Sequence, residues 1–159
     1  MVSKASRRLY ILYRLKKCRI PTSDLVAIYT MYIRPVLEYA SPVWSSSITN
    51  RQSNDIERVQ KRICRIILGG YDSYTRALDY LHLIPLSSRR EGLLLTFSSD
   101  LLLSARHRDF LPECLQAMSG RQLRNSHLLH EPKCRTTRYY QSSIPSIVRL
   151  INKNPELLT

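Results

Sequence analysis

The chain has 159 residues, of which 43% are hydrophobic and 23% are charged, a composition that is ordinary for one folded domain and argues against disorder over the whole length. It carries 25 Lys and Arg against 12 Asp and Glu, a formal net charge of +13, which predicts attraction to polyanions such as nucleic acid or an anionic membrane surface. It holds no apolar run of eighteen residues and no secretory signal pattern, so the sequence predicts neither a membrane span nor secretion.

The cysteines give an expectation about the compartment. They stand at positions 18, 64, 114 and 134, and no two of them form a C-x-x-C pair. We therefore expect reduced thiols in an intracellular protein. The sequence leaves open whether that protein is nuclear or cytoplasmic.

The N-terminal segment is basic and has a helical pattern. Leu9, Leu12 and Leu15 recur every three residues, which predicts a helix over residues 6–18 with a narrow apolar stripe. Residues 1–19 hold seven basic residues and no acid, a composition that could imitate a mitochondrial presequence. Over this alternative we favour a basic helix at the edge of a folded domain.

The second predicted helix contains a proline. Its apolar residues recur at helical spacing from Leu25 onward, and Thr22 or Ser23 can serve as the N-cap. Pro35 removes one backbone hydrogen bond and clashes with the turn before it. We therefore expect a kink or a break over residues 31–34.

The third predicted helix is the best defined. Thr49 and Gln52 form a capping-box pattern at its start, and Gly69 supplies a left-handed stop at its end. A basic face lies opposite its apolar stripe and consists of Arg58, Lys61, Arg62 and Arg65. This face is the first candidate for binding a polyanion.

The remainder of the sequence predicts further helices. They are a short helix over residues 74–81, a long apolar core helix opened by a capping box of Ser88 and Glu91, a short helix over residues 109–118 and a last helix over residues 144–151. No strand pattern of any length is present. The sequence therefore predicts an all-α fold, with a small helical bundle in residues 1–118 and a basic, partly irregular C-terminal extension in residues 119–159.

The sequence lacks the patterns of catalytic and metal sites. A two-metal polymerase or nuclease needs clustered carboxylates, but the twelve acids here are dispersed and no two are adjacent. A tetrahedral zinc site needs four ligands, whereas His127, His130 and Cys134 offer three. We therefore expect no metal, no cofactor and no catalytic residue.

The sequence does offer cationic side chains on two helices. The candidate nucleic-acid-binding residues are Arg58, Lys61, Arg62, Arg65, Arg7, Arg14 and Lys17. If the first and third helices meet, these side chains form a surface suited to a phosphate backbone, which is contacted without sequence preference. The alternative is that they only solubilise helix faces.

Two further sets of residues carry expectations. The tyrosines that could stack on bases are Tyr10, Tyr13, Tyr139 and Tyr140, although each alone is more often a packed side chain. Arg34 and Glu38 stand four residues apart on a helix, so we expect a structural ion pair rather than a role in binding.

Four segments carry a resemblance to a known family. They read YIRPVLEYASPVW (residues 32–44), IERVQKRICRIILG (56–69), YTRALDYLHLIPLSSRRE (74–91) and SSIPSIVRLINKNPELL (142–158). In this order they resemble the region that follows the catalytic palm in reverse transcriptases of non-LTR retrotransposons, of the LINE and jockey-like kind. The sequence departs from the family pattern at Ile151, where Trp is common, and at residues 143–145, where an aromatic residue is common.

The resemblance implies a thumb-like helical domain with a C-terminal extension, which in the family grips the template–primer duplex beside the palm. The family's polymerase signature, an aromatic residue followed two residues later by Asp-Asp, lies upstream of this region and is absent from the sequence. The resemblance therefore implies a catalytically inactive polymerase fragment that binds an RNA–DNA hybrid or a duplex and does not bind a membrane. A separate palm-containing polymerase is a further partner that it suggests. The alternative is a decayed element, or a structural or interaction module with no nucleic-acid role of its own.

Overall fold

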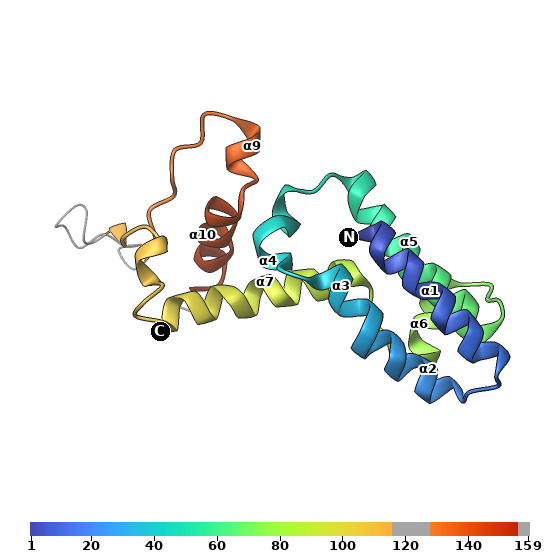
Figure 1. Cartoon of the computed structure of the whole chain (residues 1–159). Helices are drawn as coiled ribbons and strands as arrows, with labels where there is room; N and C mark the ends of the chain where they lie inside the picture. The colour runs from blue at the N-terminus through green and yellow to red at the C-terminus, as the bar shows by residue number, and fades with distance from the viewer. Residues whose placement is uncertain (116–127, 156–159) are drawn as a thin grey trace. The chain divides into compact units, whose positions relative to one another are not determined.

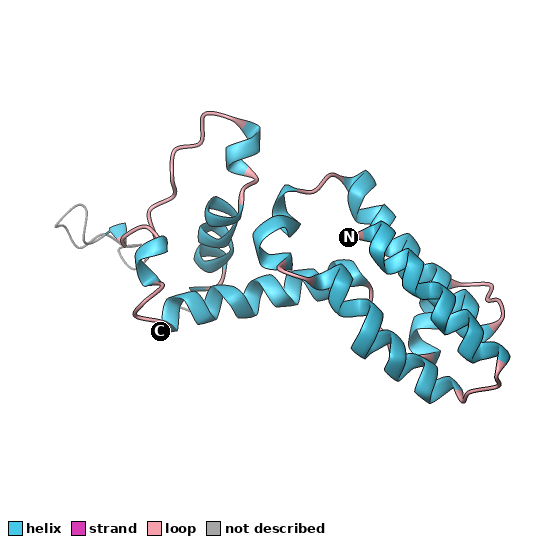
Figure 2. Ribbon diagram, viewed as in Figure 1, coloured by secondary structure: helices cyan, strands magenta, loops and turns pink. Residues whose placement is uncertain are grey.

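The fold is all-α, as the sequence predicts. The computed structural model describes residues 1–115 and 128–155 (Figure 1). Every regular element in these two ranges is a helix (Figure 2), and the only strand-like pairing there is an isolated bridge between Cys114 and Leu129. The elements are α1 (Val2–Lys17), α2 (Thr22–Ile28), the π-helix η1 (Tyr29–Ile33), α3 (Arg34–Glu38), α4 (Ser41–Trp44), the 3₁₀ helix η2 (Ser45–Ser47), α5 (Asn50–Leu68), α6 (Tyr74–Tyr80), α7 (Leu86–Leu103), the 3₁₀ helix η3 (Arg108–Phe110), α9 (Thr137–Tyr140) and α10 (Ser143–Lys153).

The chain forms two compact units. Unit 1 contains residues 1–41 and 48–90, and unit 2 contains residues 42–47 and 91–159. The division falls within α7, whose residues 86–90 belong to unit 1. The boundary that the sequence predicts, between residues 118 and 119, lies outside the described residues.

α1 and α5 pack against each other in unit 1. The side chains that α5 buries recur at helical spacing, as they do in Ile56, Val59, Ile63 and Ile67. The predicted capping box is confirmed, because the Gln52 N–H donates to Thr49 Oγ1 at 3.2 Å and the Thr49 N–H donates to Gln52 Oε1 at 2.9 Å. The sequence therefore fixes where this helix begins.

The helix also ends where the sequence predicts. Gly69 has a φ of +80°, and its N–H donates to the Arg65 carbonyl at 2.9 Å. This left-handed conformation strains any residue with a Cβ, whereas glycine adopts it freely. The end of α5 is therefore set at Gly69.

The helix is irregular before Pro35, as the sequence predicts, but the irregularity is a π-helical turn over Tyr29–Ile33 and the chain stays helical through the predicted break at residues 31–34. α2 passes into η1, and the Arg34 N–H donates to the Tyr29 carbonyl five residues earlier. The wider turn accommodates a proline that has no N–H to give to the helix. The predicted N-cap is wrong, because Pro21 occupies the cap position and no side chain accepts from the first turn.

The interior of unit 1 contains a carboxylate between two arginines. Glu38 accepts hydrogen bonds from Nε and Nη2 of Arg89, the latter at 3.1 Å. Arg34 Nε lies 3.7 Å from the same carboxylate, so the predicted Arg34–Glu38 pair is confirmed. These contacts join α3 to the start of α7.

Further buried polar contacts connect α5 to its neighbours. The Tyr29 hydroxyl donates to Gln60 Oε1 at 2.6 Å, and Gln60 Nε2 donates to the Ile84 carbonyl at 2.9 Å. The Tyr74 hydroxyl donates to the Glu57 carboxylate. Burial and these carboxylate contacts raise the pKa of the Tyr74 hydroxyl, so it stays protonated as a donor.

The start and the surroundings of α7 differ from the prediction. The helix begins at Leu86, whose N–H donates to Glu57 Oε1 at 3.3 Å, so a carboxylate from α5 receives the free amide. The capping box of Ser88 and Glu91 is therefore wrong. The helix is not buried all round either, since Leu103 is 85% exposed.

Unit 2 has a core of aliphatic side chains. Its buried members are Leu101, Leu111, Leu129, Ile147, Val148 and Ile151. The predicted last helix is confirmed as α10. Asn152 on this helix both donates to the Leu129 carbonyl and accepts from the Leu129 N–H, each at 3.0 Å. The side-chain amide thus satisfies a buried backbone segment.

Residues 109–114 are less helical than predicted. They contain the end of η3 and the bridge at Cys114, and the chain is helical again at Leu115. The rest of the predicted helix over residues 109–118 lies outside the described residues.

Candidate nucleic-acid interface

The basic face of α5 is exposed because the opposite face forms the core of unit 1. Arg58, Lys61, Arg62 and Arg65 all lie on the surface. Nη1 of Arg58 lies 2.8 Å from Asp55 Oδ1, with the arginine side chain 74% exposed. A surface pair of this kind contributes little free energy, so the guanidinium can still exchange its partner for a phosphate.

The predicted residues of α1 are also exposed. Arg14 donates to the Tyr10 hydroxyl at 3.4 Å, and its guanidinium carbon lies 5.9 Å from the centre of that ring. Lys17 Nζ lies 4.8 Å from the centre of the Tyr13 ring. These cation–π contacts hold the cations in place while leaving them accessible.

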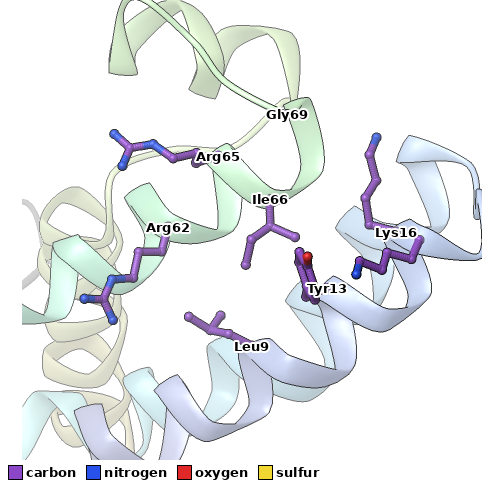
Figure 3. A pocket seen from close by; sticks show the side chains of 8 residues that line it. Leu9, Tyr13, Lys16, Arg62, Arg65, Ile66 and Gly69 are labelled. Atoms are coloured by element: carbon purple, nitrogen blue, oxygen red, sulfur yellow. The ribbon is translucent and has the colours of Figure 1, made fainter.

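The C-terminal halves of α1 and α5 form an open groove of about 500 Å³. Its lining residues are Leu9, Tyr13, Lys16, Lys17, Arg62, Arg65, Ile66 and Gly69. Leu9, Tyr13 and Ile66 project toward one another between the helices, and the charged ends of Arg62, Arg65 and Lys16 extend from the rim (Figure 3). The groove therefore has an apolar floor and a cationic rim.

The structure brings together three of the seven predicted residues at this groove, namely Lys17, Arg62 and Arg65. Arg7, Arg14, Arg58 and Lys61 do not line it. Lys61 instead extends over Tyr74 of α6, with Nζ 5.1 Å from the ring centre. Of the predicted basic residues, the groove therefore brings together only Lys17, Arg62 and Arg65.

The candidate residues do not include Lys16, although the sequence places it among the cations of the first helix, and they do not include the groove's apolar floor. The spacing holds a signal for them, because 9, 13, 16 and 17 share one face of a helix, as do 62, 65, 66 and 69. Each set combines apolar with basic residues. Two such mixed faces indicate a contact between helices that has a charged margin.

The cations on the rim exceed the charge needed to compensate the two helix ends. Lys16 and Lys17 lie in the last turn of α1, and Arg65 lies in the last turn of α5. Each helix C-terminus carries roughly half a negative charge, so two of them offset about one of the four cations. The remaining excess of about three positive charges attracts an anionic ligand.

No metal site is formed by the described part of the chain. Within residues 1–115 and 128–155, no three His, Cys, Asp or Glu side chains are grouped so that they could hold an ion. His127, one of three possible ligands considered from the sequence, lies outside these ranges. Among the described helices, none combines the length and the apolar character needed to cross a membrane.

No family model matches the sequence, and no curated protein and no solved structure matches the chain. The resemblance to the post-palm region of non-LTR reverse transcriptases therefore stays a prediction that rests on its four segments.

Proposed function

We propose that unit 1 binds the phosphate backbone of an RNA–DNA hybrid or a duplex without sequence preference. In this proposal the chain is the post-palm, thumb-like part of a non-LTR retrotransposon RNA-directed DNA polymerase and has no catalytic centre of its own. The observation that carries the proposal is the convergence of Lys17 with Arg62 and Arg65 at one groove, from helices far apart in the sequence.

The distribution of charge supports this function. Unit 1 carries 16 Lys and Arg against 6 Asp and Glu, whereas unit 2 carries 9 against 6. From Arg58 to Arg65 the basic face of α5 is about 10 Å long, enough to face about three successive phosphates of one strand. Between Arg58 and Arg65 the helix carries no acid, and the carboxylate of Asp55 borders the face only at Arg58.

The position of one family-like segment adds support. The segment IERVQKRICRIILG covers most of α5, including all four of its candidate arginine and lysine residues. In the family that the sequence resembles, this region follows the palm and grips the template–primer duplex. The basic face therefore coincides with the segment for which the resemblance implies that role.

The proposal is tested by the salt dependence of binding. The full chain is titrated against a fluorescently labelled RNA–DNA hybrid at several salt concentrations between about 50 and 200 mM. A double variant, Arg62→Gln with Arg65→Gln, should lower the slope of log K against log salt by roughly 1.8, because each lost phosphate contact removes about 0.9. The matched control is Arg138→Gln on α9, an exposed arginine in unit 2.

Two outcomes would overturn this function. Binding that does not weaken as salt rises would exclude phosphate neutralisation. A double variant with the slope of the unaltered chain would show that the α5 arginines make no contact. The lack of a catalytic centre is tested separately by primer extension with Mg²⁺, where any template-dependent synthesis by the pure chain refutes it.

A second candidate function is docking on a separate palm-containing polymerase. It is favoured by a hollow of about 440 Å³ in unit 1, lined by Met1, Lys4, Pro35, Val36 and Tyr39. Exposed apolar surface of this kind is typical of protein contacts. Capture of a purified palm-containing polymerase by the chain, and its loss in Val36→Asp but not in Arg138→Gln, would support this function.

A further inference from the structure

The apolar floor of the α1–α5 groove has no role in binding a phosphate backbone. Leu9 is 8% exposed and Ile66 is half-buried, while the Tyr13 ring is 46% exposed and faces the groove (Figure 3). Phosphates gain nothing from contact with such side chains, because apolar surface is stabilised only by excluding water. The floor therefore fits a ligand that also has an apolar face.

The size of the groove favours a compact ligand. A volume of about 500 Å³ lies in the range of sites that take small molecules. An amphipathic helix from a protein partner needs a longer groove with anchor positions over two or more turns. The cationic rim requires that the compact ligand also carries negative charge, and no acid lines the groove. A flat apolar body with an attached phosphate meets both conditions.

We propose that the groove binds an unpaired nucleotide at the end of a hybrid or duplex, with its base against Tyr13 and Ile66 and its phosphates at the cationic rim formed by Lys16, Lys17 and Arg62. This inference rests on the proposed function and specifies the form of nucleic acid that the site prefers. Bases inside a duplex are stacked and paired, so only an unpaired base can enter between the two helices. A base placed on an aromatic ring raises affinity by roughly tenfold.

The geometry at the end of the groove where α1 and α5 terminate is compatible with entry of a base. At Gly69, a Cβ would meet no atom within 4 Å, so the rim is open there. Lys17 Nζ lies 4.8 Å from the centre of the Tyr13 ring, close to the site where a base would pack. The same ammonium group is therefore close enough to bind the phosphate attached to that base.

The test compares three RNA–DNA hybrids with the same paired length in anisotropy titrations of the full chain. One is blunt, one has a short unpaired end, and one has the same unpaired end with abasic sites. We expect the unpaired end to raise affinity roughly tenfold over the blunt hybrid. The abasic end keeps the additional phosphates but lacks the bases, so most of this gain should disappear.

Variants then locate the effect. In Tyr13→Ala the affinity ratio of the unpaired to the blunt hybrid should fall from roughly ten to about one, and Tyr13→Phe should restore it because the ring alone stacks. The matched control is Tyr80→Ala on α6, a tyrosine that is 70% exposed and lies outside the groove, and it should keep the full ratio. Since Tyr13 is also partly exposed, its substitution leaves the core intact.

Failure of this inference differs from failure of the proposed function. Equal affinity for base-containing and abasic ends overturns the nucleotide site while binding to the hybrid stands. No affinity for any of the three hybrids overturns the proposed function itself. If an acidic amphipathic peptide loses its binding in Tyr13→Ala while the ratio between hybrids is unaffected, the groove is a protein site and the inference is wrong.

Discussion

Unit 1 and unit 2 are both helical but differ in what their interiors and surfaces contain. Unit 1 places a carboxylate between two arginines inside and carries a large excess of positive charge outside. Unit 2 has an aliphatic core, the side-chain amide of Asn152 bonded to buried backbone, and a smaller excess of positive charge. The positive charge of the chain is therefore not spread evenly over its surface, as charge that served only solubility would be. It is concentrated in the unit that also forms the groove.

The two interiors also differ in how strictly they fix the orientation of the helices within each unit. In unit 1, Glu38 can satisfy both Arg34 and Arg89 only if α3 and α7 keep one relative position. Aliphatic contacts, as in unit 2, tolerate small shifts more readily because they have no direction. The ion pairs of Glu38 therefore hold α3 against the start of α7 in one orientation.

The largest expected effect of a single substitution is on the core of unit 2. Ile151 is fully buried, so Ile151→Ala should lower the free energy of opening this unit by about 3 kcal/mol through lost contacts and a cavity. The measurement is hydrogen exchange of the α10 amides. Leu103→Ala, at a side chain that is 85% exposed, should change it by less than about 0.5 kcal/mol. Comparable losses in both variants would contradict the assignment of the core.

A smaller effect is expected from the buried carboxylate of unit 1. Glu38→Gln leaves two half-buried guanidinium groups without a negative partner and should cost about 2 kcal/mol. Hydrogen exchange of the α5 amides measures this loss of stability. The control is Asp55→Asn, which breaks the exposed pair with Arg58 and should cost less than about 0.5 kcal/mol. If both variants lower the stability of unit 1 by the same amount, the internal ion pair contributes no more to stability than the surface pair.

The capping box of α5 should contribute about 1 kcal/mol. Thr49→Ala removes the oxygen that accepts from the Gln52 N–H, so the first turn of α5 should fray. Exchange of the amides of residues 50–53 measures the loss, and Thr49→Ser should largely restore protection. The groove lies at the other end of α5, so an effect on hybrid binding as large as that of the Arg62 and Arg65 variant would contradict its placement.

The smallest effect near neutral pH concerns a thiol of unit 1. Burial raises the pKa of the Cys64 thiol from about 9 to about 11, so the folded state holds it protonated. The associated stability is complete below pH 9 and is lost as the pH rises toward 11. At pH 8 a thiol reagent should label exposed Cys18 and spare Cys64, as mass spectrometry can show. Equal labelling rates would contradict the burial of Cys64.

The sequence predicts best the features that depend on neighbouring residues. The capping box at Thr49, the stop at Gly69, the irregular turn before Pro35 and the Arg34–Glu38 pair all involve residues within five positions of each other. Local hydrogen bonding decides such features, so no knowledge of distant contacts is needed.

Features that depend on distant residues could not be predicted in the same way. α7 begins at Leu86 because a carboxylate of α5, 29 residues earlier, receives its amide, and the local capping pattern at Ser88 competes unsuccessfully with it. The groove likewise needs residues of α1 beside residues of α5. The sequence indicated the cations Lys17, Arg62 and Arg65, but the apolar floor looked like ordinary core until the helices were placed together.

The π-helical turn also sets the register of everything that follows it. Leu25, Tyr29, Ile33 and Leu37 are each fully buried, although they recur every four residues. In an uninterrupted α-helix, side chains at this spacing rotate by about 40° at each step, so the fourth would point about 120° from the first. The extra residue in the turn corrects this drift. If one residue is deleted there and the segment closes to a regular α-helix, the side chains of Leu25 and Leu37 are separated by eleven residues and point about 20° apart, so the apolar face of α3 stays toward the core. The π-helical turn therefore absorbs one residue of length without changing which side of α3 is buried.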